Sequence, residues 1–251
     1  MKNIFADQMR IINDHESEKD NAQSIDIKNF LKQTPVFSDQ DEQTMEIIVS
    51  SGMQKSYKKG NVILFENELG SAIYFVIKGE LKVSVINEKG SEVILTFLKE
   101  SDFFGEMSVL DETEHSANII AMEDTLLFVI RSNVFQTLLR ENSWLSIALI
   151  KEIIQRIRTA DMKIKTLSLK NSEGKVASVI MELADRTGFT GSNRVEIQNI
   201  PYQHEMASMV GTSRETVSRT ISSFVKRGLI ELTGQRMVIH DYNNFKQLFE
   251  I

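Results

Sequence analysis

The sequence contains no cysteine and only two prolines among its 251 residues. Without cysteine there is no disulfide, thiolate metal site, iron–sulfur cluster or thiol-based redox sensor. Long hydrophobic runs are also missing, because no apolar stretch approaches the roughly 20 residues that a membrane span needs. Residues 1–20 contain no apolar segment followed by a small-residue cleavage site, so we expect no signal peptide. These absences predict a cytoplasmic protein that does not associate with membranes.

An excess of basic residues is missing as well. The net charge is −6, which taken alone argues against a nucleic-acid-binding protein. The charge is unevenly distributed, since residues 171–251 hold nine Lys+Arg and nine Asp+Glu. A neutral C-terminal part can still bind DNA if its cations share one face. The length and the 41% hydrophobic content allow two domains with sizeable cores.

Short β-branched and aromatic runs recur between about residues 58 and 131. Gly60, Gly70, Gly79 and Gly90 separate several of them, and residues 87–90 form a plausible hairpin turn. The runs span residues 62–65, 73–77, 81–85, 93–97, 119–120 and 126–130. Regularly spaced short strands predict a sandwich or barrel. Residues 1–25 are mixed and polar, and we assign them no function.

The hydrophobic period changes from about Asn133. Glycine and proline are absent from Val134 to Ser172, so we predict one long helix. Its apolar residues recur with heptad spacing at Ile150, Ile153, Ile157, Ala160, Ile164 and Leu167. We interpret this stripe as the seam of a parallel dimer, because isoleucine dominates one phase and charged residues fill the others. The alternative is a helix that packs only on its own domain.

The C-terminal part has the pattern of a helix-turn-helix. A helix, a loop at residues 188–193 and two strands are expected before it. Pro201 suits the opening of a helix whose buried side is Met206, Met209 and Val210. Gly211 suits the tight turn that follows, and residues 212–215 form a capping-box sequence. Gly228 ends the second helix, and residues 229–236 predict a wing with a hairpin tip.

The second helix has two chemically distinct faces. Val217, Ile221 and Phe224 recur at helical spacing and would pack inward. The opposite face holds Arg214, Glu215, Ser218 and Arg219. Arginine can donate twice to guanine, a carboxylate can accept from cytosine, and each bidentate contact contributes about 1–3 kcal/mol of base discrimination. The alternatives are a solvated face with a Glu215–Arg219 ion pair, or a cap role for Glu215. The combination of turn, cap, wing and both arginines favours DNA recognition.

Residues 211–219, GTSRETVSR, resemble the recognition helix of the cyclic-AMP receptor protein and fumarate–nitrate regulator (Crp/Fnr) family. The resemblance extends from about Phe30 to Ile239. It implies an α+β fold with an N-terminal arm (1–25), a cyclic-nucleotide-binding-type, jelly-roll-like β-roll (26–132), a dimerisation helix (133–170) and a winged helix-turn-helix (171–251). It also implies homodimers on double-stranded, pseudo-palindromic DNA with TGTGA-like half-sites, and contact with RNA polymerase.

The resemblance assigns base contacts to Arg214, Glu215 and Arg219, and phosphate contacts to Ser213 and Thr216. The full predicted DNA-binding set is Gln203, Thr212, Ser213, Arg214, Glu215, Thr216, Ser218 and Arg219.

Residues 103–110 and 115–117 resemble the phosphate-binding cassette of the same family. A glycine and a short helical turn expose backbone N–H groups to an anion, and a carboxylate can accept from ribose hydroxyls. The resemblance places Gly105 and Glu106 at the ribose and phosphate edge, and Ser116 and Ala117 at the phosphate. The predicted cassette and wall residues are Gly105, Glu106, Met107, Ser108, His115, Ser116, Ala117, Val83, Leu95 and Leu98. The alternative is that the Gly-Glu pair serves the turn alone and that His115 is an ordinary surface histidine.

The cassette departs from the family pattern at His115, where nucleotide-binding members have arginine. Histidine is mostly neutral at pH 7, and losing a charge-assisted bond to phosphate costs about 1.5–3 kcal/mol, or ten- to a hundred-fold in affinity. By register, Arg156 resembles a pocket-facing arginine that would compensate. Thr159, Ala160 and Asp161 would meet the base, with Asp161 accepting from an amino group. The effector therefore stays open between cyclic AMP, another cyclic mono- or dinucleotide, an unrelated ligand and none.

The sequence gives little support to other functional classes, such as heme sensors and enzymes. We expect no heme, because His115 is the only histidine within the predicted sensor, and no metal cluster. We expect no enzyme, because the four histidines are scattered and neither a nucleophile elbow nor a phosphate-binding Walker loop is present. A ligand-independent regulator with a vestigial pocket stays open as the alternative.

Overall fold

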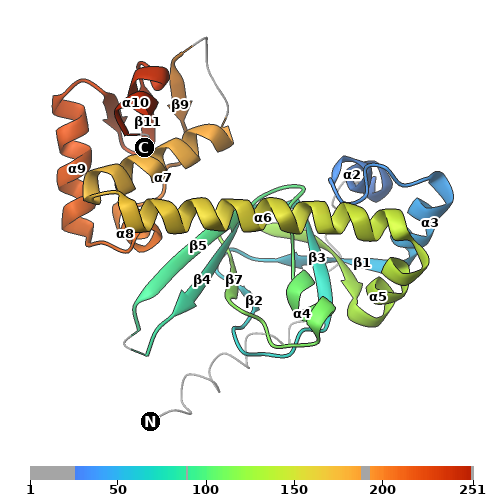
Figure 1. The fold of residues 1–251 in the computed structure, drawn as a ribbon. Coiled ribbons are helices and arrows are strands. Elements are labelled where there is room, and N and C mark those ends of the chain that lie inside the picture. Colours follow the sequence, from blue (N-terminus) through green and yellow to red (C-terminus); the bar gives the residue numbers. More distant parts are fainter. Residues whose placement is uncertain (1–25, 89, 188–192, 250–251) are drawn as a thin grey trace.

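The computed structural model describes residues 26–88, 90–187 and 193–249. They form a β-rich N-terminal domain, a long helix that crosses it, and a smaller C-terminal domain at the end of that helix (Figure 1). The N-terminal arm predicted over residues 1–25 and most of the predicted loop, residues 188–192, lie outside the described residues.

Two antiparallel four-stranded sheets build the N-terminal domain. One has the order β1 (Gly52–Tyr57), β8 (Thr125–Arg131), β3 (Ala72–Lys78) and β6 (Phe103–Phe104). The other has the order β2 (Val62–Leu64), β7 (Asn118–Ala121), β4 (Leu81–Ile86) and β5 (Glu92–Leu98). The strands predicted from the sequence are therefore confirmed. Strands β1 and β6 were not predicted, because β1 is largely polar and exposed and β6 has two residues.

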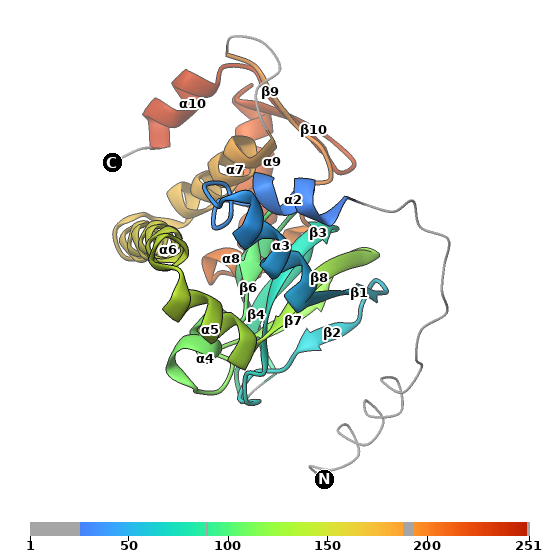
Figure 2. The same ribbon diagram turned by 90° about the vertical axis from the view of Figure 1, so that its right-hand side faces the viewer.

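The core of this domain has two parts. Between the sheets, Tyr74 stacks on Phe104 with ring centroids 4.9 Å apart, among buried aliphatic residues. The outer face of the β1–β8–β3 sheet is covered by α2 (Ile27–Gln33), α3 (Glu42–Ser51) and α5 (Ser132–Glu141), as Figure 2 shows from the side. Strand β3 is buried over all but its last residue because both of its faces are covered.

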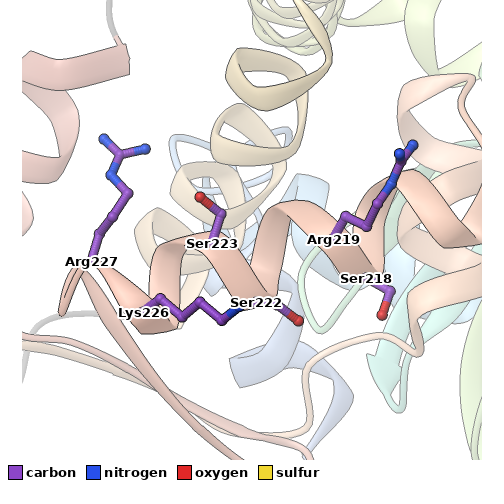
Figure 3. Close-up of a pocket in the computed structure, with 6 residues that line it drawn as sticks. All are labelled: Ser218, Arg219, Ser222, Ser223, Lys226 and Arg227. Carbon is purple, nitrogen blue, oxygen red and sulfur yellow. The ribbon is translucent and has the colours of Figure 1, made fainter.

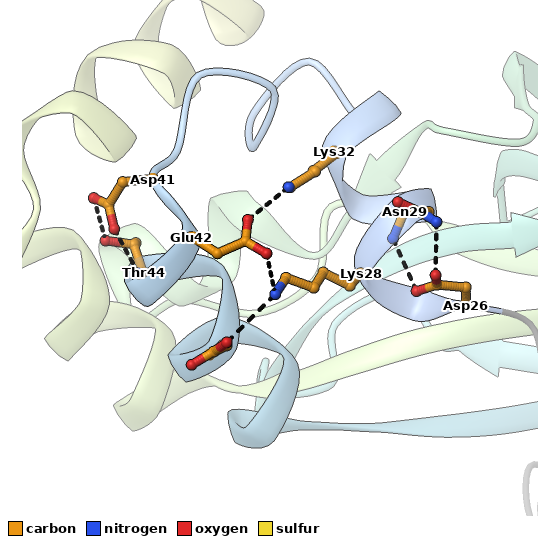
Figure 4. A network of polar contacts seen from close by, with 8 residues as sticks. Asp26, Lys28, Asn29, Lys32, Asp41, Glu42 and Thr44 are labelled. Carbon is orange, nitrogen blue, oxygen red and sulfur yellow. Dashed lines mark hydrogen bonds and ion pairs between the residues drawn. The ribbon is translucent and has the colours of Figure 1, made fainter.

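A polar network joins α2 to α3 (Figure 4). Asp26 and Asp41 cap the two helices, and Asp41 accepts from the Thr44 backbone N–H at 2.9 Å. Glu42 accepts from both Lys28 and Lys32. These two ammonium groups lower the pKa of the Glu42 carboxyl from 4.5 to about 2. Glu42 therefore stays ionised and paired with both lysines at all but strongly acidic pH.

The prediction of a single long helix is wrong, because the chain breaks at Asn142. Its backbone is extended, and its side chain accepts from the Leu145 N–H at 3.1 Å, which caps α6 (Ser143–Leu169). The break lets Phe135 and Leu138 of α5 turn onto the sheet while α6 runs across the domain.

The C-terminal domain is a winged helix-turn-helix, as expected. It comprises α7 (Ser172–Thr187), β9 (Val195–Ile197), α8 (Gln203–Val210), α9 (Arg214–Lys226), β10 (Ile230–Thr233), β11 (Arg236–Ile239) and α10 (Tyr242–Phe249). The β10–β11 hairpin is the predicted wing, and β9 completes its sheet. Among the described residues only β9 precedes α8, where two strands were predicted. Pro201 lies just before the N-cap of α8, Tyr202, and outside the helix itself.

The two domains touch directly. Helix α8 packs against β5 of the sensor domain. Lys163 of α6 donates to the Leu95 carbonyl on β5 and to Glu182 on α7, both at 3.0 Å. The β4–β5 hairpin, α6 and the DNA-binding domain are therefore linked through one ammonium group. No helix in the described ranges is both long and apolar enough to traverse a bilayer.

Candidate DNA-binding helix and effector site

The local sequence sets where the recognition helix begins. Gly211 adopts the left-handed conformation, with φ of 64°, at the turn after α8. Ser213 is the N-cap of α9, and its hydroxyl accepts from the Thr216 N–H at 3.2 Å. The predicted capping box through residues 212–215 is therefore wrong by one residue: Thr212 precedes the cap, and Glu215 is in the first turn.

The two faces of α9 are confirmed. Val217, Ile221 and Phe224 are buried in the core of the domain, whereas Arg214, Glu215 and Arg219 are exposed. Arg219 donates to Thr216 Oγ1 at 3.4 Å, and no ion pair joins it to Glu215 in the part of the chain that the structure describes. Two guanidinium groups and one carboxylate are therefore exposed over the first half of α9.

Glu215 remains ionised at neutral pH. Its own backbone N–H, the Ser213 hydroxyl and the charges of Arg214 and Arg219 together lower the pKa of its carboxyl below the ordinary value. An ionised carboxylate only accepts hydrogen bonds. Glu215 can therefore accept from a cytosine amino group between two arginines that can donate to guanine.

A polar groove of about 420 Å³ follows α9 from Ser218 onward and includes Arg219 (Figure 3). It is lined by Ser218, Arg219, Ser222, Ser223, Lys226 and Arg227. Ser222 and Lys226 were not among the predicted contacts, although their helical spacing from Arg219 could have indicated them. Arg227 has a different role, since it pairs with Glu173 and thereby joins the end of α9 to α7.

The sensor cassette begins at Gly105. This residue has φ of 82°, and a Cβ there would lie 2.7 Å from the Ala72 carbonyl oxygen, so only glycine fits. Helix α4 (Glu106–Asp111) starts immediately after it. The turn predicted for the cassette is therefore present.

Glu106 and Arg156 come together from elements 50 residues apart. The guanidinium of Arg156 donates to Glu106 Oε1 at 2.9 Å and to the Phe103 carbonyl at 2.5 Å, and it lies 4.0 Å over the Phe103 ring. The Glu106 side chain is buried. Arg156 holds the carboxylate through this ion pair and makes three contacts with two residues, Glu106 and Phe103.

The alternative that His115 is an ordinary surface histidine is wrong. The residue is 8% exposed, and its Nδ1 lies 3.0 Å from the Ser108 hydroxyl. Burial lowers the pKa of the imidazole, and the charge of Glu68 only partly opposes this effect. His115 is therefore neutral at pH 7 and supplies no fixed cation to a phosphate.

The burial of His115 predicts a pH dependence of stability. The unfolded chain binds a proton near the ordinary pKa of 6.5, whereas the folded chain binds it only at lower pH. The contribution of His115 to stability is thus present above 6.5 and is lost as pH falls toward the folded pKa. Urea unfolding at about pH 7.5 and about pH 5.5 should show a smaller loss in His115→Gln than in the parent protein. Equal losses would contradict a buried, neutral imidazole.

The other predicted pocket residues are distributed over several surfaces. Ala117 and Leu98 are buried, and Val83 is partly buried against the core between the sheets. Ser116 is exposed, and its hydroxyl lies 4.0 Å from Met107 Sδ. Leu95 lies beside the bulge between β4 and β5, and its side chain is largely exposed. Thr159, Ala160 and Asp161 are exposed on α6. No cluster of three potential metal ligands occurs among the described residues.

Helix α6 presents an apolar stripe to solvent. The exposed isoleucines of this stripe are Ile147, Ile150, Ile154, Ile157 and Ile164. Four members of the predicted seam, Ile150, Ile157, Ala160 and Ile164, are exposed, but Ile153 packs against the sensor core and Ile154 is exposed in its place. The helix therefore packs on its own domain with one face and leaves a second face free. The side chain of Leu167 lies outside the described part of the structure.

Comparison with known proteins matches both domains. Residues 54–142 match the cyclic nucleotide-binding domain, and residues 174–248 match the Crp-like helix-turn-helix domain. The cyclic AMP receptor protein of Thermus thermophilus is 30% identical over 202 residues, which cover 80% of this chain and 90% of the relative.

Solved structures have the same fold. A CooA variant from Carboxydothermus hydrogenoformans superposes with a TM-score of 0.72 at 23% identity, covering 88% of this chain and 98% of that one. The c-di-GMP responsive global regulator CLP of Xanthomonas campestris gives 0.69 at 17% identity, covering 80% and 99%. With both domains, the recognition helix and a full-length relative in agreement, the chain belongs to the Crp/Fnr family of transcription regulators.

Proposed function

We propose that the protein is a homodimeric, sequence-specific DNA-binding regulator whose β-roll binds a small effector. The observation that supports this most strongly is the first half of α9, where Arg214, Glu215 and Arg219 are exposed while the apolar side of the helix is packed in the core. Such a helix can enter the major groove without disturbing the core. The protein would act on cytoplasmic DNA together with RNA polymerase.

On DNA, the two arginines and the carboxylate would contact base edges of a TGTGA-like half-site. Gln203, Thr212, Ser213, Thr216 and Ser218 surround them on α8 and at the start of α9 and would contact the backbone. Lys226 extends the positive face two turns further along α9, where a phosphate of the flanking duplex would lie. A two-fold dimer presents this set twice, one helical turn of DNA apart.

The DNA proposal is tested by fluorescence anisotropy at fixed salt. A duplex with two TGTGA-like half-sites should bind at least roughly 1,000-fold more tightly than a scrambled duplex of equal length. Equal affinities for the two duplexes would show that α9 does not recognise bases.

In the sensor, the sugar side of a cyclic nucleotide fits better than its phosphate side. Arg156 occupies Oε1 of Glu106, and Oε2 of the same carboxylate is left to accept from a ribose hydroxyl. Ser116 offers an exposed hydroxyl to the phosphate, but His115 is neutral and Arg156 is engaged. We therefore expect a cyclic nucleotide to bind more weakly than in a pocket with a fixed cation. The names of the Thermus and Xanthomonas relatives make cyclic AMP and c-di-GMP the first effectors to test.

The β4–β5 hairpin is the proposed route from the effector to the DNA-binding domain. It covers one side of the sensor, touches α8, and is held to α6 and α7 through Lys163. An effector that binds one hairpin position more tightly than another would shift α8, and with it α9.

Glu106→Gln should abolish stabilisation by the effector. If the pocket binds a nucleotide, an effector concentration of 100 times Kd stabilises the parent protein by about 2.7 kcal/mol, and the variant should lose most of this. Thermal melting with cyclic AMP, cyclic GMP and c-di-GMP measures the effect, with the exposed Glu100→Gln as the matched control. Equal stabilisation of Glu106→Gln would contradict the proposed ribose contact. A parent protein that none of these nucleotides stabilises would instead favour the ligand-independent alternative.

A further inference from the structure

Trp144 is the only tryptophan in the chain, and it is 73% exposed at the start of α6. Tryptophan has the largest apolar side chain, and burying it removes about 150–250 Å² of surface from water. Exposed tryptophans of this kind are typical of contact surfaces, where they often dominate the binding energy. The exposure of Trp144 therefore indicates a contact surface at the start of α6.

A groove of suitable chemistry lies at the same end of α6. It has a volume of about 310 Å³ and is lined by Leu110, Leu139, Arg140, Ser146, Leu149, Ile150 and Ile153. Its walls are mostly aliphatic, and it has one guanidinium, which can lie against an aromatic face. Ile150 also belongs to the exposed stripe of α6, so the groove is continuous with the proposed dimer seam.

Helix geometry shows that Trp144 and this groove lie on opposite sides of the stripe. At about 100° per residue, Trp144 lies roughly 90° to one side of the line through Ile147, Ile150 and Ile154. Ser146 and Ile153 lie about as far to the other side. Trp144 therefore cannot reach the groove of its own protomer across the face of the helix.

A two-fold dimer brings the two features together. When parallel helices pair around a two-fold axis, the left side of one stripe faces the right side of its partner, and equal positions stay at equal height. We propose that the indole of Trp144 in each protomer occupies the groove of the other protomer. This inference rests on the proposed parallel α6 dimer and names a contact that fixes its register.

The single tryptophan makes the contact directly observable. The dimer should show blue-shifted tryptophan emission and protection from acrylamide quenching, and both should be lost on dilution to monomer. Leu110→Asp in the groove should expose the indole, whereas Leu248→Asp on α10 should not; both leucines are about half exposed and tolerate polar substitution. Trp144→Ala should raise the dimer dissociation constant roughly 30-fold or more.

Sedimentation separates the two ways in which the inference can fail. A dimer whose Trp144 emission stays solvent-exposed overturns the tryptophan contact and leaves the dimer proposal intact. A protein that is monomeric at every concentration overturns both.

Mixing two variants tests whether the contact is made between protomers. Trp144→Ala and Leu110→Asp each lack both contacts as homodimers, but a mixed dimer retains one intact pair. The mixed dimer should therefore form in preference to either homodimer. Random pairing of the two variants would contradict a contact in which Trp144 of one protomer occupies the groove of the other.

Discussion

Alanine at Arg219 is expected to weaken binding to the cognate duplex and to relax sequence preference. A bidentate arginine–guanine contact contributes about 1–3 kcal/mol, and the dimer makes it twice, so the total loss is about 2–6 kcal/mol. This corresponds to roughly 30- to 20,000-fold in affinity. Arg214→Ala should behave in the same way, because its guanidinium is also exposed, in the first turn of α9. Anisotropy titrations with matched and mismatched duplexes at one salt concentration measure the effect.

Arg194→Ala is the matched control for both variants. Arg194 is also an exposed arginine of the C-terminal domain, but it lies just before β9 and is not part of α9. Its removal should lower affinity for matched and mismatched duplexes alike, because it changes only the overall charge. If the control lost sequence preference as strongly as Arg219→Ala, this result would contradict the proposal that α9 recognises bases.

Aspartate at Ile154 is expected to convert the dimer to monomers. Ile154 is 42% exposed, so burying its remaining surface in each protomer contributes about 1–3 kcal/mol to the pair, and two facing carboxylates add a desolvation cost. The dimer dissociation constant should therefore rise at least roughly 100-fold in sedimentation experiments. DNA affinity should fall with it, since a monomer meets only one half-site.

Met162→Asp tests the assignment of the seam. Met162 is 67% exposed on the same helix but lies to one side of the stripe. The variant should remain dimeric at the concentrations where Ile154→Asp is monomeric. If Met162→Asp dissociates and Ile154→Asp does not, the dimer uses a different face of α6.

The sequence was most informative where local patterns determine structure. The strands between residues 62 and 131 follow from β-branched runs between turns, because each strand needs only its own alternation and its flanking breaks. The buried face of α9 follows from helical spacing, since Val217 and Ile221 share one side and Arg219 lies on the other. Arg214 is only about 20° from Ile221 around the helix and is exposed in the first turn. These features were predicted correctly before any contact was known.

The misjudged features depend on tertiary contacts. Isoleucine occupies both residues 153 and 154, so periodicity could not show which one packs on the sensor and which faces solvent. The break at Asn142 combines a local cap with a hydrogen bond from its side-chain amide to Gln40, 102 residues away. The burial of His115 depends on Ser108, and the fixed position of Arg156 depends on Phe103 and Glu106, 53 and 50 residues away. No local pattern reports such pairings.

Selection from a pool of random duplexes tests the central claim most directly. The purified protein, with and without cyclic nucleotide, should enrich a two-fold symmetric site whose half-sites are centred about 10–10.5 base pairs, or one helical turn, apart. The Arg219→Ala variant should lose the preference at defined base pairs within each half-site. Enrichment of no common sequence, or of an asymmetric site that the variant binds equally well, would contradict the account.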